Sequence, residues 1–296
     1  MKMSKFIKST LILLVGGFLT KVLGMLIKII TTRIIGTETL GLYMLIMPTF
    51  NLFITLAQGG LPISVSKIVS ENKKDNKKIV FSSIFISICT TFFLMILLIF
   101  ISPLIAKFLH NDSLSFPIMC IGLTLPFISL SGIIRGYFFG KENMFPHVLS
   151  NNFEQVVRII LNIIFLPLLS NYEPRVSVTF LILSNVISET TSIIILYFFL
   201  PRKIKITKEM LKPEKIIIKD VLNISIPTTG SRIIGTIGYF LEPIVLTSFL
   251  LMNGYTTNYI TYEYGVLTGY VMPLLLLPSF FTMAISQATL PVISNG

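Results

Sequence analysis

Two lysines, Lys21 and Lys28, lie seven residues apart within an apolar stretch near the start of the sequence. Seven residues are close to two turns of an α-helix, so a helix here would carry both ammonium groups on one face. A charged side chain at the middle of a bilayer costs about 2.5–3.5 kcal/mol, so each needs a partner, an aqueous cavity or a path to the interface. The pair therefore indicates either the wall of a cavity that binds an anion such as phosphate or pyrophosphate, or two lysines that reach lipid headgroups from a tilted helix.

Glu189 is a carboxylate in the middle of another apolar stretch. It lies in the sequence SNVISETTS, which begins at Ser184 and is rich in hydroxyl and amide side chains. Such a polar segment within a bilayer is expected to face other helices. Three roles fit Glu189 at this point: a relay for a cation or proton, a partner for one of the basic residues, or a hydrogen-bonding contact between helices.

Glu154 and Arg158 are spaced four residues apart in the sequence EQVVR. This spacing places the two side chains next to each other on a helix, and a pair neutralises its own insertion cost. We therefore predict a structural ion pair. Arg135, which ends an apolar stretch, is predicted to anchor that stretch at the membrane interface.

Basic residues outnumber acidic ones within the apolar stretches. The basic members are Lys21, Lys28, Arg135, Arg158 and Arg232, and the acidic members are Glu154, Glu189 and Glu242. This imbalance favours an anionic cargo over a cationic one.

Residues suited to enzyme chemistry are sparse. The two histidines, His110 and His147, are far apart in the sequence, and neither HExxH nor a Walker A motif occurs. Cys89 and Cys120 lie in apolar stretches without metal-ligand spacing, so we predict that both are reduced packing residues. The sequence predicts no enzyme, no metal site and no cofactor.

The elements that must position these residues are membrane spans. Hydrophobic residues make up 53% of the 296-residue chain and charged residues 12%, and the mean hydropathy is +0.85. A span needs about 20 apolar residues. The sequence supplies about eight such stretches, so we predict an all-α, polytopic helical bundle. The predicted limits are residues 9–35, 39–66, 79–108, 115–139, 147–170, 176–200, 219–251 and 260–294.

Lysine and arginine positions predict the orientation of the chain. They concentrate in the N-terminal tail and in residues 71–78, 140–152 and 201–220, whereas the alternate gaps contain only Arg175. Cytoplasmic loops carry this excess of positive charge, so we expect a cytoplasmic N-terminus in the plasma membrane. Because the charges follow this loop pattern, the net charge of +11 indicates membrane lipids as partners and not nucleic acid.

The basic segment 201–220 divides the spans into two groups. We predict a six-helix lobe over residues 1–200, a basic cytoplasmic linker over 201–220, in which a surface-lying amphipathic helix is plausible, and the first two helices of a truncated second lobe over 221–296. The two groups of spans share a weak sequence similarity: Met47-Pro48 is followed by LPIS, and Met272-Pro273 is followed by LPVIS. The sequence ends two residues after LPVIS without a basic anchor, so we expect a longer chain.

Residues 135–158, RGYFFGKENMFPHVLSNNFEQVVR, resemble the signature of the stage V sporulation protein B and polysaccharide-biosynthesis exporters. The superfamily that contains this family also contains lipid II flippases. Residues 21–36, 60–71 and 264–280 are similar to further parts of the family pattern, so the resemblance covers essentially the whole chain. It implies the N-terminal part of a two-lobe exporter of about fourteen helices, with Lys21, Lys28 and Arg232 lining a cationic central cavity.

The resemblance implies a flippase for a polyprenyl diphosphate-linked sugar lipid, similar to lipid II, in peptidoglycan or spore cortex synthesis. One alternative is a multidrug and toxin extrusion type cation antiporter, whose cavity should contain acidic cation sites in place of paired lysines. Another is a non-transporting membrane scaffold that recruits cell-wall synthesis proteins through its basic loops.

Overall fold

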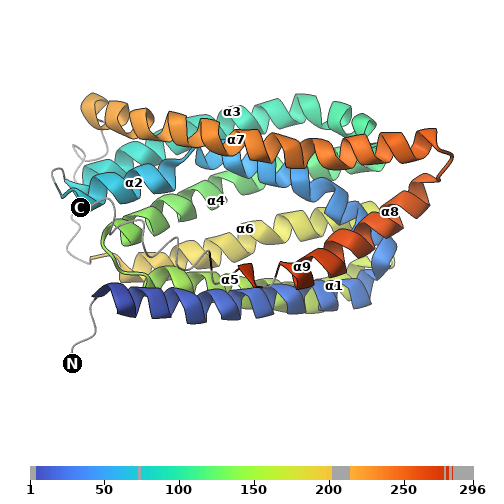
Figure 1. Cartoon of the computed structure of the whole chain (residues 1–296), viewed down its shortest axis with the longest axis horizontal. Coiled ribbons are helices and arrows are strands. Elements are labelled where there is room, and N and C mark those ends of the chain that lie inside the picture. The colour runs from blue at the N-terminus through green and yellow to red at the C-terminus, as the bar shows by residue number, and fades with distance from the viewer. Residues whose placement is uncertain (1–4, 73–74, 202–213, 277, 280–281, 283–296) are drawn as a thin grey trace.

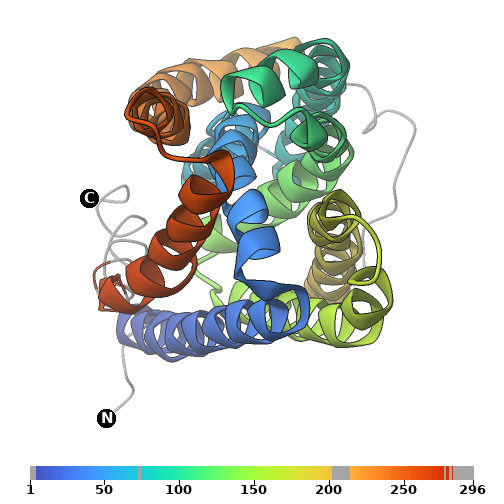
Figure 2. The same cartoon turned by 90° about the vertical axis from the view of Figure 1, so that its right-hand side faces the viewer.

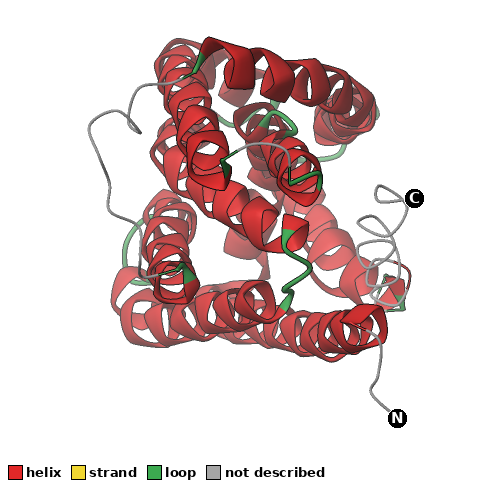
Figure 3. Ribbon diagram, turned by 90° about the vertical axis from the view of Figure 1, so that its left-hand side faces the viewer, coloured by secondary structure: helices red, strands yellow, loops and turns green. Residues whose placement is uncertain are grey.

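The computed structural model describes residues 5–72, 75–201, 214–276, 278–279 and 282. Within these residues the chain is helical and contains no strand, and six of its helical segments are long and apolar enough to cross a membrane. Figure 3 shows the helices in red and the described loops between them in green. The prediction of an all-α membrane helical bundle is confirmed.

The first two predicted spans form one kinked helix. Helix α1 extends from Lys5 to Gln58 and consists of two helices that meet at a kink at Gly36, inside the gap predicted between the spans 9–35 and 39–66. Only Gly36 leaves the helical conformation, at φ 77° and ψ 166°, a region that residues with a Cβ atom rarely enter. A second break, which was not predicted, interrupts the span 39–66 at Gly59 and Gly60, both in left-handed conformation, before α2 begins at Leu61 and ends at Ser70.

Four further helices complete the region that was predicted as the first lobe. Their bounds fall within three residues of the predicted ones, because runs of apolar residues and the polar turns between them fix where a span can end. They are α3 (Asn76–Phe108), α4 (Ser115–Gly140), α5 (Phe145–Leu169) and α6 (Pro174–Phe199), with a 3₁₀ turn, η1 (Asp112–Leu114), before α4.

The last described part of the chain consists of α7 (Lys215–Met252), α8 (Thr257–Val266), the π-turn η2 (Leu267–Val271) and α9 (Met272–Leu275). Helix α7 starts inside the predicted linker, so residues 215–220 form its first turns and are not part of a linker. Residues 202–213, which include most of that linker and its predicted amphipathic helix, lie outside the described residues, as do LPVIS and the C-terminal part of the final predicted span.

The long helices lie side by side, roughly parallel (Figure 1). The first half of α1 and the whole of α7 lie on opposite sides of the molecule in both Figure 1 and Figure 2. Helix α8 crosses between them, from the end of α7 toward the first half of α1 (Figure 2). The second half of α1 also runs from one of these sides to the other, where Thr55 hydrogen-bonds Thr236 of α7.

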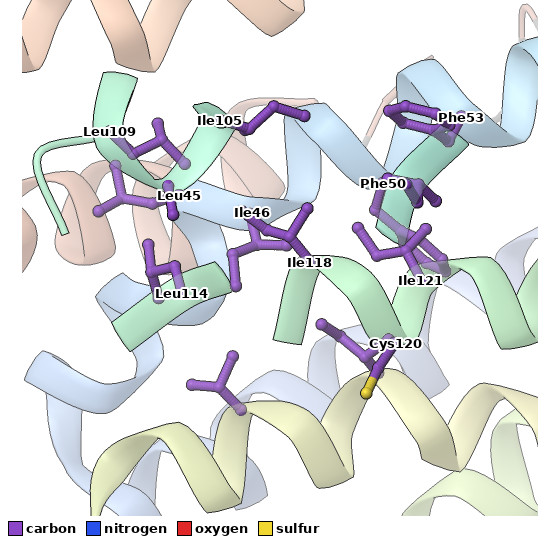
Figure 4. Packing of buried hydrophobic residues seen from close by; sticks show 14 of the residues in the cluster. Leu45, Ile46, Phe50, Phe53, Ile105, Leu109, Leu114, Ile118, Cys120 and Ile121 are labelled. Atoms are coloured by element: carbon purple, nitrogen blue, oxygen red, sulfur yellow. The ribbon is translucent and has the colours of Figure 1, made fainter. Parts of the chain in front are cut away.

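The main hydrophobic core lies between the second half of α1 and helices α3, α4 and α6. Figure 4 shows Leu45, Ile46, Phe50 and Phe53 of α1 packed near residues of α3, η1 and α4. Van der Waals packing holds these apolar surfaces together, because lipid tails are themselves as apolar as leucine side chains. The core fixes the second half of α1, so the kink at Gly36 leaves the first half free to pack elsewhere.

Helices α2 and α4 approach each other closely at small residues. A Cβ atom at Gly136 would overlap the carbonyl oxygen of Pro62, and one at Gly140 would lie 2.6 Å from the carbonyl oxygen of Ser66. Small residues spaced four apart allow two membrane helices to touch along their backbones. This contact holds the C-terminal half of α4, and therefore Arg135, in place.

Candidate functional site

Lys28 is bound to a backbone carbonyl from the far end of the described chain. Its Nζ atom donates a hydrogen bond of 3.3 Å to the carbonyl oxygen of Thr268 in η2. Lys21 lies two turns earlier on α1, close enough for the two positive charges to interact, and both lysines are half-buried. Among the residues that the structure describes, no carboxylate lies within ion-pair distance of either lysine.

Arg232 lies on α7 with its side chain exposed. The first half of α1, which carries Lys21 and Lys28, is on the opposite side of the molecule (Figures 1 and 2), and no contact joins Arg232 to them in the described chain. The structure therefore brings Lys21 and Lys28 near each other but does not bring Arg232 to them. Its role in substrate binding stays a prediction.

Glu154 is the centre of a buried charge cluster. Its Oε1 atom accepts a hydrogen bond of 2.8 Å from Nη2 of Arg158, and its Oε2 atom accepts one of 2.9 Å from Nη2 of Arg135. The Glu154 side chain is only 8% exposed, so both contacts are shielded from solvent. Arg135 was predicted to anchor the end of a span, but only 16% of its side chain is exposed, and it is a member of this cluster.

Glu189 joins the same cluster from α6. Its Oε2 atom lies 3.5 Å from Nη2 of Arg135, and its side chain is 8% exposed. Two hydroxyls of α6 accept hydrogen bonds from the arginines, Ser192 from Arg135 at 2.7 Å and Ser188 from Arg158 at 3.3 Å. The four charged side chains sum to zero and connect α4, α5 and α6. Of the roles left open for Glu189, this geometry corresponds to a partner for a basic residue.

Polar contacts that the sequence analysis did not anticipate join α5 to the first half of α1. The amide of Asn162 donates a buried hydrogen bond of 2.9 Å to the hydroxyl of Thr31, and the hydroxyl of Thr20 donates one of 3.0 Å to Asn152. The sequence contained a sign of the Asn162 contact, because Asn162 continues the four-residue spacing of Glu154 and Arg158 along one face of α5. These contacts link the helix that carries the lysines to the helix that carries the charge cluster.

A groove of about 580 Å³ lies apart from both groups of charges. Its lining is almost wholly apolar and comes from α4, α5 and α6. The lining residues are Phe116, Leu169, Arg175, Val176, Thr179, Phe180 and Leu183. Arg175 is paired with Glu173, so the groove presents no unpaired charge to a ligand.

The sequence of residues 6–296 matches the family described as polysaccharide biosynthesis protein. The chain belongs to this family. Among its relatives are two proteins of Bacillus subtilis (strain 168). Over 98% of its length the chain is 38% identical to stage V sporulation protein B and spans 58% of that protein. Over 53% of its length it is 27% identical to the lipid II flippase MurJ and spans 31% of it.

Solved structures show the same fold. The chain matches the MATE multidrug transporter DinF-BH with a TM-score of 0.74 at 17% identity, over 99% of the chain and 65% of that transporter. It also matches a MOP superfamily transporter from Pyrococcus furiosus, with a TM-score of 0.65 at 18% identity, over 97% of the chain and 71% of that protein. The chain is therefore a multi-pass plasma-membrane protein with an exporter-type fold.

Proposed function

We propose that this chain is part of a flippase that moves a polyprenyl diphosphate-linked sugar lipid, similar to lipid II, across the plasma membrane. Its relatives support the proposal, since they include a sporulation protein and a lipid II flippase. The chain spans only 58% of stage V sporulation protein B. The flippase activity is therefore proposed for the whole protein and not for this chain alone. The process served would be synthesis of peptidoglycan or spore cortex, and cell-wall synthesis proteins are candidate partners.

The observation that carries the proposal is the contrast between two sets of buried charges. Arg135 and Arg158 are neutralised by Glu154 and Glu189, whereas Lys21 and Lys28 have no carboxylate partner in the described chain. A diphosphate would supply the missing negative charge, and hydrogen bonds to charged groups contribute about 1.5–3 kcal/mol each. A cation antiporter would instead need free carboxylates in place of paired lysines. Glu242 of α7 has no ion pair among the described residues, so it is the pair Lys21 and Lys28 that counts against this alternative.

Complementation tests the proposal. Cells depleted of their own lipid II flippase would receive the protein in the longest form that its locus encodes, either unchanged or with Lys21→Gln and Lys28→Gln combined. Lys141→Gln is the matched control, because Lys141 is an exposed lysine in the turn between α4 and α5. Immunoblots of membranes would show that all forms insert to equal levels.

We expect the unchanged protein and the control to restore growth and the double variant to fail. Loss of two charged hydrogen bonds should weaken headgroup binding by roughly 100-fold or more. Rescue by the double variant at the level of the unchanged protein would refute the cationic site and favour a scaffold. Failure of every form despite insertion would refute lipid II as the cargo.

A further inference from the structure

The Thr268 carbonyl, which accepts the hydrogen bond from Lys28, lacks both of its usual backbone donors. In an α-helix it would accept from the N–H of Met272, four residues on, but that N–H donates to Leu267, five residues back. In a π-turn it would accept from residue 273, but this is Pro273, which has no N–H. The register of η2 and the proline together leave this carbonyl without a backbone partner.

An unsatisfied carbonyl is costly inside a membrane, where no bulk water can replace the missing donor. Lys28 supplies the donor from another helix, at 3.3 Å. Lys28 is also without a carboxylate partner in the described part of the chain. The ammonium group therefore gains an acceptor, and the carbonyl gains a donor. The bond is thus the polar contact that fastens η2, and with it the end of α8, to the first half of α1.

We propose that the bond between Lys28 and Thr268 is a latch between α1 and η2, and that an anionic cargo headgroup releases it. This inference rests on the proposed function for the nature of the cargo. An anion held by both Lys21 and Lys28 lies between them along α1, so the Lys28 ammonium turns toward Lys21 and leaves Thr268. A carbonyl carries a partial charge and a diphosphate carries full charges, so the anion is the stronger acceptor.

Release has a structural consequence because α8 crosses between the two sides of the molecule (Figure 2). Helix α1 packs against α5 through Thr20 and Thr31, so the first half of α1 moves with α5 and not with α8. Without the latch, η2 has an unsatisfied carbonyl and no polar contact to Lys28. Helix α8 stays packed on the start of the second half of α1, where a Cβ atom at Gly265 would lie 2.8 Å from the Cα atom of Gly41. The separation therefore occurs between η2 and the first half of α1, and cargo binding is coupled to a change in the position of that half relative to α8.

Distances between spin labels test the latch without measuring transport. Labels would be attached at Asn171→Cys, in the exposed turn that follows α5, and at Asn258→Cys, on an exposed position of α8. The background would carry Cys89→Ser and Cys120→Ala, because both native cysteines are free thiols. The purified protein in lipid nanodiscs would be measured with and without inorganic pyrophosphate.

We expect the parent protein to give a narrow distance distribution, and Lys28→Met to give a broader one shifted to longer distances. Lys21→Met is the matched control and should resemble the parent, because no bond within the described residues joins Lys21 to η2. Pyrophosphate should move the parent toward the Lys28→Met distribution and leave Lys28→Met unchanged. An unaltered distribution in Lys28→Met would refute the latch, and a parent that does not respond to pyrophosphate would refute its release by the anion.

Pro273→Ala keeps the inference testable if Lys28→Met fails to fold. Alanine restores an N–H that can donate a hydrogen bond to the Thr268 carbonyl. This variant therefore retains the Lys28 charge, but the carbonyl no longer depends on Lys28 for a donor. It should shift the distances in the same direction as Lys28→Met, and a distribution equal to that of the parent would count against the latch. If the distances behave as expected while complementation fails, the latch stands and the assignment of lipid II as cargo falls.

Discussion

At the residue scale, the charges inside this membrane protein divide into a neutralised set and an available set. The cluster around Glu154 consists of two arginines and two glutamates, each within 3.5 Å of an opposite charge. Lys28, in contrast, is bound to an uncharged carbonyl. Arg232 and Glu242 of α7 also lack an ion pair among the described residues, but Lys21 and Lys28 are the two like charges that lie near each other.

Removing the central carboxylate of the cluster should destabilise the protein. Glu154→Gln leaves Arg135 and Arg158 with less negative charge than positive, and breaking a buried ion pair costs about 3–5 kcal/mol. Thermal unfolding of the purified protein in detergent should show a lower midpoint. Glu173→Gln is the control, because its pair with Arg175 is more than half exposed, with side chains 67% and 54% accessible, and such pairs contribute about 0–1 kcal/mol. Equal midpoints for the two variants would contradict a stabilising role for the cluster.

The sequence could indicate some of these contacts but not all of them. The four-residue spacing of Glu154 and Arg158 makes an interaction visible, because neighbours on a helix face are set by local geometry. The contacts of Arg135 and Glu189 depend on how three helices pack, which no local spacing records. The partner of Lys28 was still harder to anticipate, since it is a backbone carbonyl freed by a π-turn and by Pro273.

At the scale of elements, close contacts between helices depend on small residues. Helix α4 carries Gly136 and Gly140 where it meets α2, and a single added Cβ atom at either position would clash with backbone. Apolar run lengths predicted where most helices begin and end. They placed the gap between the first two spans at the right position, but they could not show that the gap is a kink at one residue, Gly36, and not a loop.

An alanine at Gly136 should therefore weaken the bundle. The added methyl group would push α2 away from α4, and overpacking of this kind costs about 1–3 kcal/mol. Gly17→Ala is the matched control, since a Cβ atom there meets nothing within 4 Å. The control should unfold at the same temperature as the parent or slightly higher, because alanine favours helix over glycine by about 1 kcal/mol. A Gly136→Ala protein as stable as the control would show that α2 can shift without loss.

At the scale of the whole molecule, the order and lengths of the helices follow from composition and loop charge, and the fold class was predictable for that reason. The manner in which α8 crosses toward the first half of α1 was not predictable, since it depends on the kink at Gly36 and on contacts between distant segments. The orientation of the molecule in the membrane stays a prediction from loop charge.

Labelling from outside the cell would check this orientation. In a background without native cysteines, Asn171→Cys should react with a membrane-impermeant maleimide on intact cells, because the turn between α5 and α6 is expected outside. Lys141→Cys, in the preceding turn, should react only after the cells are opened. Both residues are exposed, so access to solvent on one side of the membrane decides the result. The reverse pattern would place the N-terminus outside.

The neutrality of the Glu154 cluster also determines how the protein responds to the electric field of an energised membrane. A group with zero net charge can be displaced along the membrane normal without net electrical work, so helices α4 to α6 can tilt with their cluster at any membrane potential. The Lys28 ammonium has no countercharge among the described residues, and moving one full charge across the membrane changes the energy by about 2.3 kcal/mol per 100 mV. The voltage across the membrane therefore acts on α1, and on the proposed function a bound diphosphate would cancel or reverse the sign of that force.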